Sequence, residues 1–284
     1  METNVHQAIV VGYDGSAYAD RALRWAADES LRTGDPVRLV HVLPPPYDPA
    51  AWQVELIDPA TRMVELARAE TVERSPRLSI TAEVIVGDPI TVLRELSAES
   101  GLIVLGSRGL GGFTGMLAGS VAVAVATHAA CSVVLIRRLP EGLSLPVVAG
   151  FDESAHALSA VKRALVEAAV RRAPLTVVHA WRPPLPRPRT SEPWRAEEIA
   201  EIESAEREVM HSRVDPLAKQ YPDVSVGLRL VAGSAGSALI AAAERAQLVV
   251  VGHRGRGGFT GLLLGSVGLH LMRHTDCPLM IVRE

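Results

Sequence analysis

The chain has very little lysine and cysteine. Of its 284 residues, only Lys162 and Lys219 are lysines, only two residues are cysteines, and the formal net charge is −3. Two cysteines cannot form a disulfide framework, which favours a reducing compartment. A chain without a basic excess is also not typical of nucleic-acid-binding proteins. We therefore expect neither a disulfide-stabilised secreted module nor a nucleic-acid partner.

Membrane and export signals are also missing. Residues 1–6 are polar and lack the basic and apolar regions of a signal peptide. Residues 109–136 contain no Asp, Glu, Lys or Arg and are long enough to suggest a membrane helix. Their five glycines, with His128 and Ser132, instead favour a glycine-rich loop, a short buried helix and a buried strand. We expect a cytoplasmic protein without a membrane span.

The chain contains one long internal repeat. Residues 12–16 (GYDGS) recur 138 positions later as residues 150–154 (GFDES). Residues 106–122 recur 146 positions later as residues 252–268, with twelve of the seventeen positions identical. The repeat predicts two homologous domains, residues 1–140 and residues 145–284.

Both halves alternate short apolar runs with helical patterns. In the first half, strands are predicted at residues 8–11, 37–43, 79–86, 102–105 and 133–136. Helices are predicted at residues 17–31, 52–74, 92–99 and 120–128. Continuous Val, Ile and Leu runs separated by helices favour a parallel sheet covered on both faces. With right-handed crossovers, each half becomes a doubly wound α/β domain.

Two unusual features follow predicted strands. Asp14 follows the first strand, and a glycine-rich loop beginning at Gly106 follows the fourth. Ligands of open parallel sheets bind beyond the carboxyl ends of the strands, at the point where the strand order reverses. Asp14 and the loop can therefore meet only if the first and fourth strands are neighbours.

The glycine loop has features of an anion site. Gly106, Gly109 and Gly119 can leave backbone N–H groups accessible. Ser120 stands at the start of an apolar helix, where it can cap the helix or donate its hydroxyl to a ligand oxygen. The positive end of that helix favours phosphate. A surface loop without a chemical role is the alternative, which the identical glycine spacing of the two halves disfavours.

Two common nucleotide motifs are absent. No G-x-x-x-x-G-K-[ST] sequence occurs, and neither lysine lies in a glycine loop, which excludes a P-loop lysine. The pattern G-x-G-x-x-G also fails after Gly109, because Gly111 is followed by Gly112, Phe113 and Thr114. A dinucleotide site of the usual dehydrogenase kind is therefore not expected.

The spacing Gly106-x2-Gly109-x9-Gly119-Ser120, repeated from Gly252 to Ser266, resembles the ATP-binding signature of universal stress proteins. The aspartates after the first strands agree with it, as do the histidines near the ends of the second strands and the His-x2-Cys pairs before the last strands. The resemblance covers essentially the whole chain, in the tandem two-domain form. It implies a five-stranded parallel sheet in each half, Rossmann-like and of the adenine nucleotide alpha hydrolase-like kind.

The resemblance also implies one ATP site per domain. Asp14 and Asp152 would hydrogen-bond a ribose hydroxyl or the base, and the backbone of Val42 and Ala180 would face adenine. Gly106 and Gly252 would contact the ribose. The implied phosphate-binding residues are Gly109, Gly119, Ser120, Val121, Gly255, Gly265, Ser266 and Val267. Gly12 and Gly150, two residues before the aspartates, complete the expected binding sets, and a Mg²⁺ ion on the phosphates is a further implication.

Several other residues have two interpretations. Arg108 and Arg254 either clamp phosphate oxygens or face solvent. His41 and His179 are expected to be packed histidines rather than catalytic ones. The pairs His128/Cys131 and His274/Cys277 are expected to be structural rather than metal ligands. Asp88 has no acidic counterpart at Ser234, and Trp52, Trp181 and Trp194 could cover the sites or pack on a partner.

No general base or nucleophile stands out in the sequence. The leading hypothesis is a non-enzymatic, ATP-binding regulator or sensor of stress or growth arrest, acting on an unidentified protein partner. The alternatives are a slow ATPase or ATP-dependent phosphotransferase of related fold, and a dimerisation module with degenerate sites. Pairing of the last strands, residues 133–136 and 279–282, is expected either in a homodimer or within the chain.

Overall fold

The computed structural model describes residues 7–45, 56–109, 118–140, 142, 145–182, 195–257 and 263–283. Backbone contacts divide the chain into two compact units. Unit 1 comprises residues 1–140 and 272–284, and unit 2 comprises residues 141–271. The last strand of the second sequence repeat therefore belongs to unit 1. The predicted domains, residues 1–140 and 145–284, follow the sequence repeat and do not coincide with these two units.

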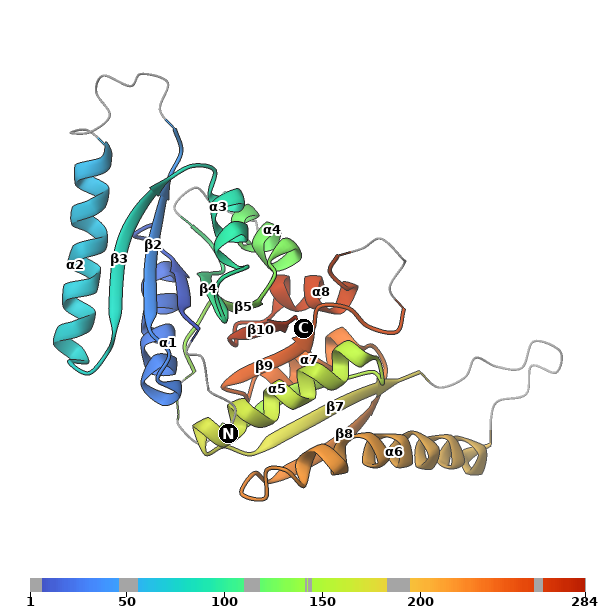
Figure 1. Ribbon diagram of the computed structural model, residues 1–284. Coiled ribbons are helices and arrows are strands. Elements are labelled where there is room, and N and C mark those ends of the chain that lie inside the picture. Colours follow the sequence, from blue (N-terminus) through green and yellow to red (C-terminus); the bar gives the residue numbers. More distant parts are fainter. Residues whose placement is uncertain are drawn as a thin grey trace. The chain divides into compact units, whose positions relative to one another are not determined.

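Unit 1 contains a six-stranded mixed sheet in the order β3-β2-β1-β4-β5-β10 (Figure 1). Its strands are β1 (Ile9–Gly12), β2 (Val37–Leu43), β3 (Ile80–Val86), β4 (Leu102–Gly106), β5 (Ser132–Ile136) and β10 (Leu279–Val282). Its helices are α1 (Ala17–Thr33), α2 (Asp58–Arg74), α3 (Pro89–Leu96) and α4 (Ser120–His128). Strands β1 to β5 are mutually parallel, as predicted.

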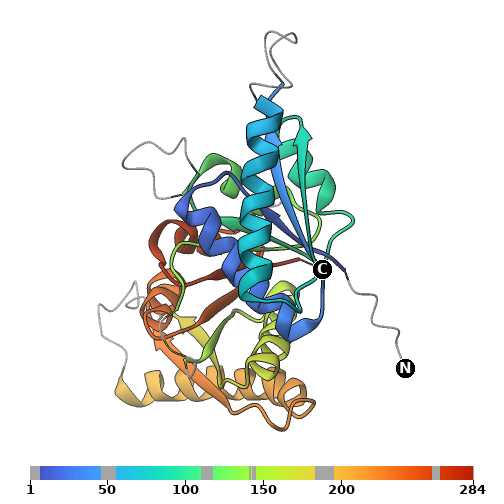
Figure 2. The same cartoon turned by 90° about the vertical axis from the view of Figure 1, so that its left-hand side faces the viewer.

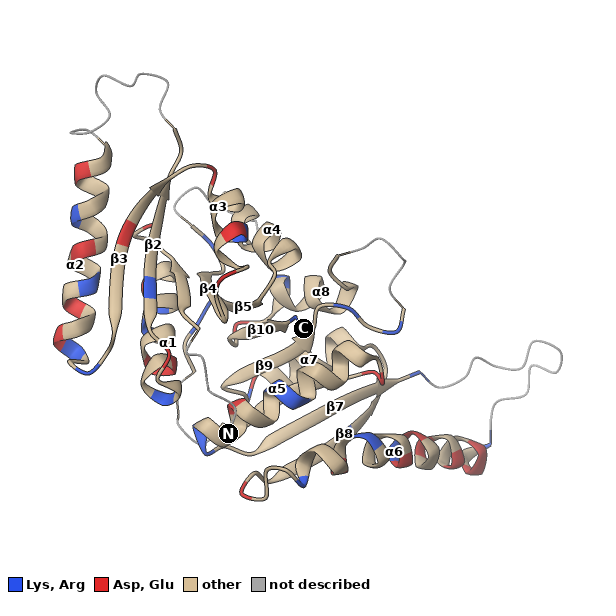
Figure 3. Ribbon diagram, in the orientation of Figure 1, with Lys and Arg blue, Asp and Glu red and all other residues tan. Residues whose placement is uncertain are grey.

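Helices cover both faces of this sheet. Helices α1 and α2 pack against the strands on one face, and Figure 2 shows both in front of them. Helices α3 and α4 contact each other and pack on strands β2 and β5. The inner face of α1 is buried and includes Ala22, Leu23, Ala26, Ala27 and Ser30. Helix α2 presents its charged residues along its exposed side (Figure 3).

The first and fourth strands are neighbours in the sheet, as the proposed meeting of Asp14 and the glycine loop requires. Strand β1 pairs in parallel with both β2 and β4, so the strand order reverses between β1 and β4. Gly12 lies opposite Leu105 across this pair. The loops that follow the two strands consequently leave the same edge of the sheet, where doubly wound proteins bind ligands.

The sixth strand runs antiparallel to the rest. Strand β10 pairs with β5 in a register that places Met280 opposite Val134 and Ile281 opposite Val133. The two last strands of the sequence repeats therefore pair within one chain, which was one of the two predicted arrangements. All residues of β10 and β5 are buried, because β10 covers what would otherwise be an apolar sheet edge.

Unit 2 contains four parallel strands in the order β9-β6-β7-β8. They are β6 (Val147–Phe151), β7 (Leu175–Trp181), β8 (Val226–Ala232) and β9 (Leu248–Gly252). The helices are α5 (Ala155–Arg171), α6 (Ala196–Ala218) and α7 (Ala235–Ala243), whereas α8 (Ser266–His274) begins in unit 2 and ends in unit 1. Unit 2 thus repeats the strand-helix alternation of unit 1.

Most predicted elements match the structure to within a few residues, and the second strand and fourth helix match at both ends. The third helix begins at Pro89 instead of residue 92, because Asp88 accepts a hydrogen bond from the Thr91 N–H and caps it. Trp52 and Trp194 lie outside the described residues. Trp181 ends strand β7 and is buried.

Residues 109–136 do not form one long helix. Within them, the described residues form the nine-residue helix α4 and the strand β5. In the described parts of the chain, no helix combines the length and apolar character that a membrane span requires.

Candidate functional site

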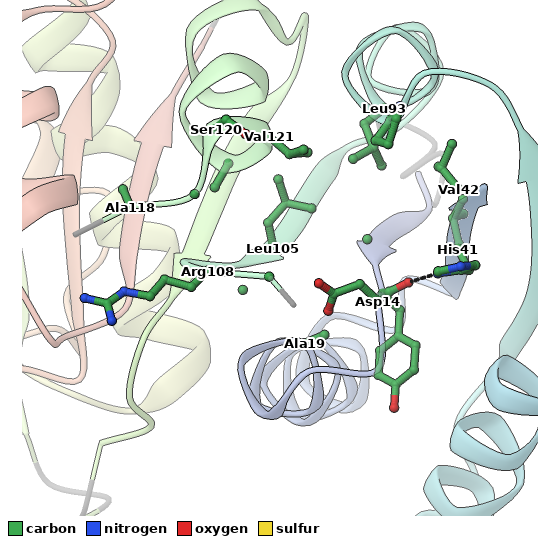
Figure 4. Close-up of a pocket in the computed structure, with 18 residues that line it drawn as sticks. Asp14, Ala19, His41, Val42, Leu93, Leu105, Arg108, Ala118, Ser120 and Val121 are labelled. Atoms are coloured by element: carbon green, nitrogen blue, oxygen red, sulfur yellow. Dashed lines mark hydrogen bonds between the residues drawn. The ribbon is translucent and has the colours of Figure 1, made fainter. Parts of the chain in front are cut away.

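A cavity of about 530 Å³ lies beyond the carboxyl ends of β1 and β4 in unit 1 (Figure 4). All nine binding residues predicted for the first half line it: Gly12, Asp14, Val42, Gly106, Arg108, Gly109, Gly119, Ser120 and Val121. The cavity therefore brings together residues from four separate segments of the sequence. Residues 110–117 of the glycine loop, including Gly111 and Gly112, lie outside the described residues.

Asp14 is fixed by the start of helix α1. Its Oδ1 accepts a hydrogen bond of 3.0 Å from the Ser16 N–H, while Ser16 Oγ accepts one of 3.2 Å from the Ala19 N–H and caps the helix. Gly15 takes a φ of 78°, which a residue with a side chain rarely adopts. Figure 4 shows the Asp14 carboxylate pointing into the cavity. The turn thus holds the Asp14 carboxylate at the cavity.

Gly109 lies directly against this carboxylate. A β-carbon at Gly109 would lie 2.5 Å from Asp14 Oδ2. In unit 2, a β-carbon at Gly255 would overlap Oδ2 of Asp152. The second glycine of each signature is therefore required by the aspartate of the same unit.

The other signature glycines have different structural roles from the one expected. A β-carbon at Gly106 would lie 2.8 Å from the Tyr18 carbonyl carbon, so glycine there permits close packing of β4 on helix α1. The Gly119 N–H is not accessible, because it donates a 2.8 Å hydrogen bond to the Ser107 carbonyl. In unit 2, the Gly265 N–H makes the same bond to His253. The prediction that the Gly119 N–H is accessible is therefore wrong.

The available donors lie at the start of helix α4. Gly119 is the N-cap residue, with a φ of −71° and a ψ of 147°, and it has no side chain to cap the helix. Ser120 is the first helical residue, so the interpretation of Ser120 as the cap is wrong. The first N–H groups of an α-helix, here those of Ser120, Val121 and Ala122, have no partner within the helix. All three residues line the cavity.

This helix start differs from the others that lie near the site. Ser16 caps α1 through its hydroxyl oxygen and Asp88 caps α3 through its carboxylate. Hydrogen bonds from Thr91 hold the pKa of the Asp88 carboxyl below its ordinary value. Helix α4 instead directs uncompensated N–H groups and the positive end of its dipole at the cavity, which favours an anion.

The opposite wall is mostly apolar. It includes Val40, Val42, Leu93 and Leu105, and Figure 4 shows Leu93, Leu105 and Val42 around one side of the space. Such a wall suits a flat heterocycle. His41 also lines the cavity, and its Nδ1 lies 2.6 Å from the Tyr13 carbonyl oxygen.

Tyr13 and His41 are held as structural groups. A carbonyl oxygen can only accept, so His41 Nδ1 carries the hydrogen and donates it to Tyr13. The Tyr13 hydroxyl donates a 2.7 Å hydrogen bond to Asp20 Oδ1, and burial together with this bond raises the Tyr13 pKa well above its ordinary range. These contacts agree with the prediction that the strand-end histidine is a packed residue.

Arg108 has its backbone at the site and its charge elsewhere. Figure 4 shows its guanidinium directed away from the cavity, and its Cζ lies 6.0 Å from the centre of the Tyr18 ring. In this conformation Arg108 forms no clamp around a phosphate. Arg254 shares one feature with it, since the Nε atoms of both arginines are buried and have no hydrogen-bond partner among the described residues.

Unit 2 places its predicted residues in the same relation to its strands. Gly150 lies in β6, Asp152 follows β6, Ala180 lies in β7 and Gly252 ends β9. The loop residues Arg254, Gly255 and Gly265 precede α8, which starts with Ser266 and Val267. The predicted second site therefore has the elements of the first.

Both carboxylate oxygens of Asp152 accept hydrogen bonds within unit 2. Its Oδ1 accepts hydrogen bonds from the Ser154 N–H at 3.1 Å and the Ser154 hydroxyl at 2.6 Å. Its Oδ2 accepts one of 2.8 Å from the N–H of Arg256, whose guanidinium also pairs with Glu153. Arg256 could not be predicted from the repeat, because the first half has leucine at the matching position, 110.

The His-x2-Cys pair of unit 1 has local structural roles. His128 Nδ1 donates to the Ala124 carbonyl at 2.9 Å, one turn earlier in helix α4. The Cys131 thiol donates weakly to the Ser132 carbonyl at 3.4 Å, and burial raises its pKa to about 11. A protonated, buried thiol is a poor metal ligand. Asp88 and Ser234 are equivalent as well, since both cap helices.

A model described as the universal stress protein family matches residues 6–137 and again residues 145–283. The chain belongs to the universal stress protein family. Its tandem form agrees with the internal repeat. The predicted Rossmann-like α/β fold is confirmed, with mixed pairing in unit 1.

Curated universal stress proteins match this one over nearly its whole length. A relative from Mycobacterium tuberculosis (strain ATCC 25618 / H37Rv) is 32% identical over 299 residues, covering 99% of this chain and 98% of the relative. One from Mycobacterium bovis is 33% identical over 308 residues, covering 99% of this chain and 96% of its own.

Solved structures of the family share the fold. A universal stress protein from Archaeoglobus fulgidus DSM 4304 has a TM-score of 0.66 and 18% identity, over 98% of this chain and 99% of its own. A putative universal stress protein from Pseudomonas aeruginosa UCBPP-PA14 has a TM-score of 0.69 and 17% identity, over 98% and 93% of the two chains. At these identities the similarity concerns the fold alone.

Proposed function

We propose that this universal stress protein binds ATP in the cavity of unit 1 and acts as a non-enzymatic regulator or sensor. One observation carries the proposal: the uncapped start of helix α4 opens into a cavity that also holds the Asp14 carboxylate and an apolar wall. A nucleotide has three chemically distinct parts, and each has a complementary surface here.

The triphosphate would occupy the start of helix α4. The N–H groups of Ser120 and Val121 and the Ser120 hydroxyl would donate to phosphate oxygens, in the field of the helix dipole. Because backbone groups supply these donors, the site needs no lysine, which fits the lysine-poor composition. Gly109 would keep the passage between Asp14 and the phosphates free of a side chain.

Asp14 and the apolar wall would select the nucleoside. Asp14 Oδ2 would accept a hydrogen bond from a ribose hydroxyl, while Oδ1 stays bound to the Ser16 N–H. The backbone at Val42 would face the adenine edge, and Leu93 and Leu105 would contact its faces. A ligand without a sugar or a base would lose these contacts.

A Mg²⁺ ion would be held mainly by the phosphates. Among the described residues that line the cavity, Asp14 is the only carboxylate and Ser120 is the only hydroxyl at the helix start. Magnesium commonly keeps several waters and takes one or two protein ligands besides phosphate oxygens. These two oxygen donors are compatible with that arrangement, and the ion would neutralise phosphate charge.

The available groups favour binding over turnover. His41 commits its Nδ1 hydrogen to the Tyr13 carbonyl, and Tyr13 commits its hydroxyl to Asp20. Asp14 is fixed by the α1 turn and would serve the ribose. The Nε2 atom of His41 remains a base, but His41 lies on the Val42 side of the cavity, where adenine would bind, and not at the start of helix α4, where the phosphates would bind.

We propose a second ATP site in unit 2, formed by the matching residues. Asp152 there already accepts the Arg256 N–H, so a ribose hydroxyl would have to share or replace this bond.

Calorimetric titration of the full-length protein with Mg²⁺ and ATP tests the proposal. The wild type should bind ATP, Gly109→Glu should remove the site in unit 1, and Gly255→Glu should remove the site in unit 2. Release of ADP over many turnovers, lost in Asp14→Ala, would instead support the ATPase alternative. Absence of any ATP binding by a folded wild type would refute the proposed function.

A further inference from the structure

Three side chains from separate elements of unit 2 converge outside the predicted nucleotide residues. Glu153 lies in the turn between β6 and α5, His179 lies in β7 and Glu206 lies in α6. One ligand atom of each lies within 4.8 Å of the others. His179 is buried, while the two glutamates are half-buried, with side-chain exposures of 23% and 30%.

The hydrogen-bond pattern fixes the tautomer of His179. Its Nδ1 lies 2.8 Å from the Phe151 carbonyl oxygen, which can only accept, so the ring hydrogen is on Nδ1. The Phe151 ring also packs edge-on against the imidazole, with centroids 5.6 Å apart. Both contacts hold the ring in one orientation, so a neutral His179 ring carries its lone pair on Nε2.

That lone pair faces a carboxylate. Glu206 Oε2 lies 3.1 Å from His179 Nε2, with the histidine side chain only 6% exposed. Two lone pairs at this distance repel each other unless a positive charge joins them. The charge can be a proton on Nε2 or a cation bound by both atoms, and the Glu153 carboxylate beside them offers a third ligand atom for a cation.

The first repeat lacks this cluster. Gly15 occupies the position of Glu153, and its backbone has nearly the same left-handed conformation, with φ of 78° against 66°. Unit 2 therefore retains a carboxylate where glycine is the residue that the backbone favours. In unit 1, the side chain next to Gly15 is the thioether of Met63. The comparison shows that the fold of these units does not itself require Glu153.

We propose that Glu153, His179 and Glu206 bind one divalent transition-metal ion, with Zn²⁺ preferred to Mg²⁺ and Ca²⁺. One imidazole nitrogen and two carboxylate oxygens are ligands that Zn²⁺ accepts, with water completing a tetrahedral site. The bond from Nδ1 to a backbone carbonyl is the usual outer contact of a metal-bound histidine. Two carboxylates would balance the charge of the ion.

The neighbouring arginine can remain in place. Arg256 pairs with Oε1 of Glu153, and a carboxylate can bind a metal and a guanidinium through different oxygens. The ion would link Glu206 of helix α6 to Glu153, which follows Asp152, and to His179, which precedes Ala180 in β7. It would thereby stiffen the region of the proposed second nucleotide site, although metal binding itself does not depend on that proposal.

Titration of the metal-free, full-length protein with ZnCl₂ in the absence of nucleotide tests the site. His211 and Asp215 form an exposed pair on helix α6 that could bind Zn²⁺ weakly, so the measurements use His211→Ala as the background. We expect one Zn²⁺ per chain and a rise in the unfolding temperature. Co²⁺ should give visible absorption bands with the intensity of a four-coordinate site.

Two variants locate the ion, and a third is the control. Glu206→Gln and Glu153→Gly should each weaken Zn²⁺ binding at least tenfold, and Glu153→Gly should also raise the unfolding temperature of the metal-free protein. Glu208→Gln, at an exposed position of the same helix, should leave Zn²⁺ binding unchanged. The proposal is overturned if the background protein binds no Zn²⁺, or if Glu206→Gln binds it as tightly. Either result would identify the contact as an imidazolium–carboxylate pair.

Discussion

A β-carbon at Gly109 would lie 2.5 Å from Oδ2 of Asp14, a separation that non-bonded atoms do not sustain. The two residues are 95 positions apart in the sequence, yet the position of the Asp14 carboxylate leaves no space for a side chain at residue 109. Gly109→Ala should therefore displace the Asp14 carboxylate and weaken ATP binding by about tenfold or more, the loss of one charge-assisted hydrogen bond. Calorimetric titration with ATP measures this change.

Two controls separate the clash from a general loss of stability. Gly227→Ala in strand β8 adds a β-carbon that meets no atom within 4 Å, so it should leave ATP binding intact. In the double variant Gly109→Ala/Asp14→Ala the clash is gone, and the unfolding temperature should return toward that of Asp14→Ala alone. Unchanged ATP affinity in Gly109→Ala would contradict this relationship.

The uncapped start of helix α4 predicts opposite effects on stability and binding. Gly119→Asp introduces a capping carboxylate at a position where an added β-carbon meets its nearest atom at 3.5 Å, an ordinary contact. The new side chain should stabilise the protein by a few tenths of a kcal/mol. It should also occupy the helix N–H groups, repel phosphate and lower ATP affinity by about tenfold or more.

Thermal unfolding and ATP titration of the same Gly119→Asp sample measure both effects. Gly119→Ala is the matched variant, because it adds the β-carbon without a capping group and should bind ATP more tightly than Gly119→Asp. Equal ATP binding by Gly119→Asp and wild type would mean that phosphate does not use the start of α4.

The ends of helices α4 and α8 are each held by an arginine of the other sequence repeat. Arg283, after β10, donates to the carbonyls of Ala126 and Thr127 in the last turn of α4. Arg137, at the matching position after β5, donates to the last turn of α8. Arg283→Met should lower the free energy of unfolding by about 1–3 kcal/mol, because the last carbonyls of α4 lose a charged donor.

Urea unfolding measures the effect of Arg283→Met. Arg74→Met, which removes an exposed pair with Glu70, is the control and should cost less than about 1 kcal/mol. Equal urea midpoints for the two variants would show that Arg283 contributes no more to stability than an exposed surface charge.

The thiol of Cys131 should react slowly. Burial raises its pKa to about 11, from an ordinary value of 9.0. At pH 8 the thiolate fraction of the folded protein should be about 100-fold lower than in the unfolded chain, and alkylation by iodoacetamide should be slowed at least as much. Mass spectrometry of the modified peptide follows the rate.

The sign of the pH dependence follows from the raised pKa of Cys131. Burial of the neutral thiol favours the folded state below pH 9, and this contribution is lost as the pH rises toward 11. Cys131→Ser should therefore have a flatter stability profile between those pH values. Rapid alkylation of folded protein at pH 8 would contradict the assignment.

Local patterns were sufficient to predict most elements and to select residues of the first half that line one cavity. The apolar runs at β2 and β5 and the spacing from Gly106 to Ser120 are short-range signals, and all nine residues chosen in the first half line one cavity. The role of Gly106 could not be predicted, because it depends on how closely helix α1 approaches β4.

Other features depend on tertiary contacts that no short pattern records. Glu153 and Glu206 are 53 residues apart and come together only through the packing of α6. The side chain of Arg256 approaches Glu153 only once the second glycine loop is folded. The pairing of β10 with β5 was foreseen from their apolar edges, but its register required the structure.

A crystal structure of the full-length protein grown with ATP and Mg²⁺ would show directly whether ATP binds in the cavity of unit 1. We expect phosphate oxygens within hydrogen-bond distance of the Ser120 and Val121 N–H groups, a ribose hydroxyl on Asp14 and adenine beside Val42. An empty unit 1 cavity in a protein that binds ATP in solution, or a nucleotide bound elsewhere, would contradict it.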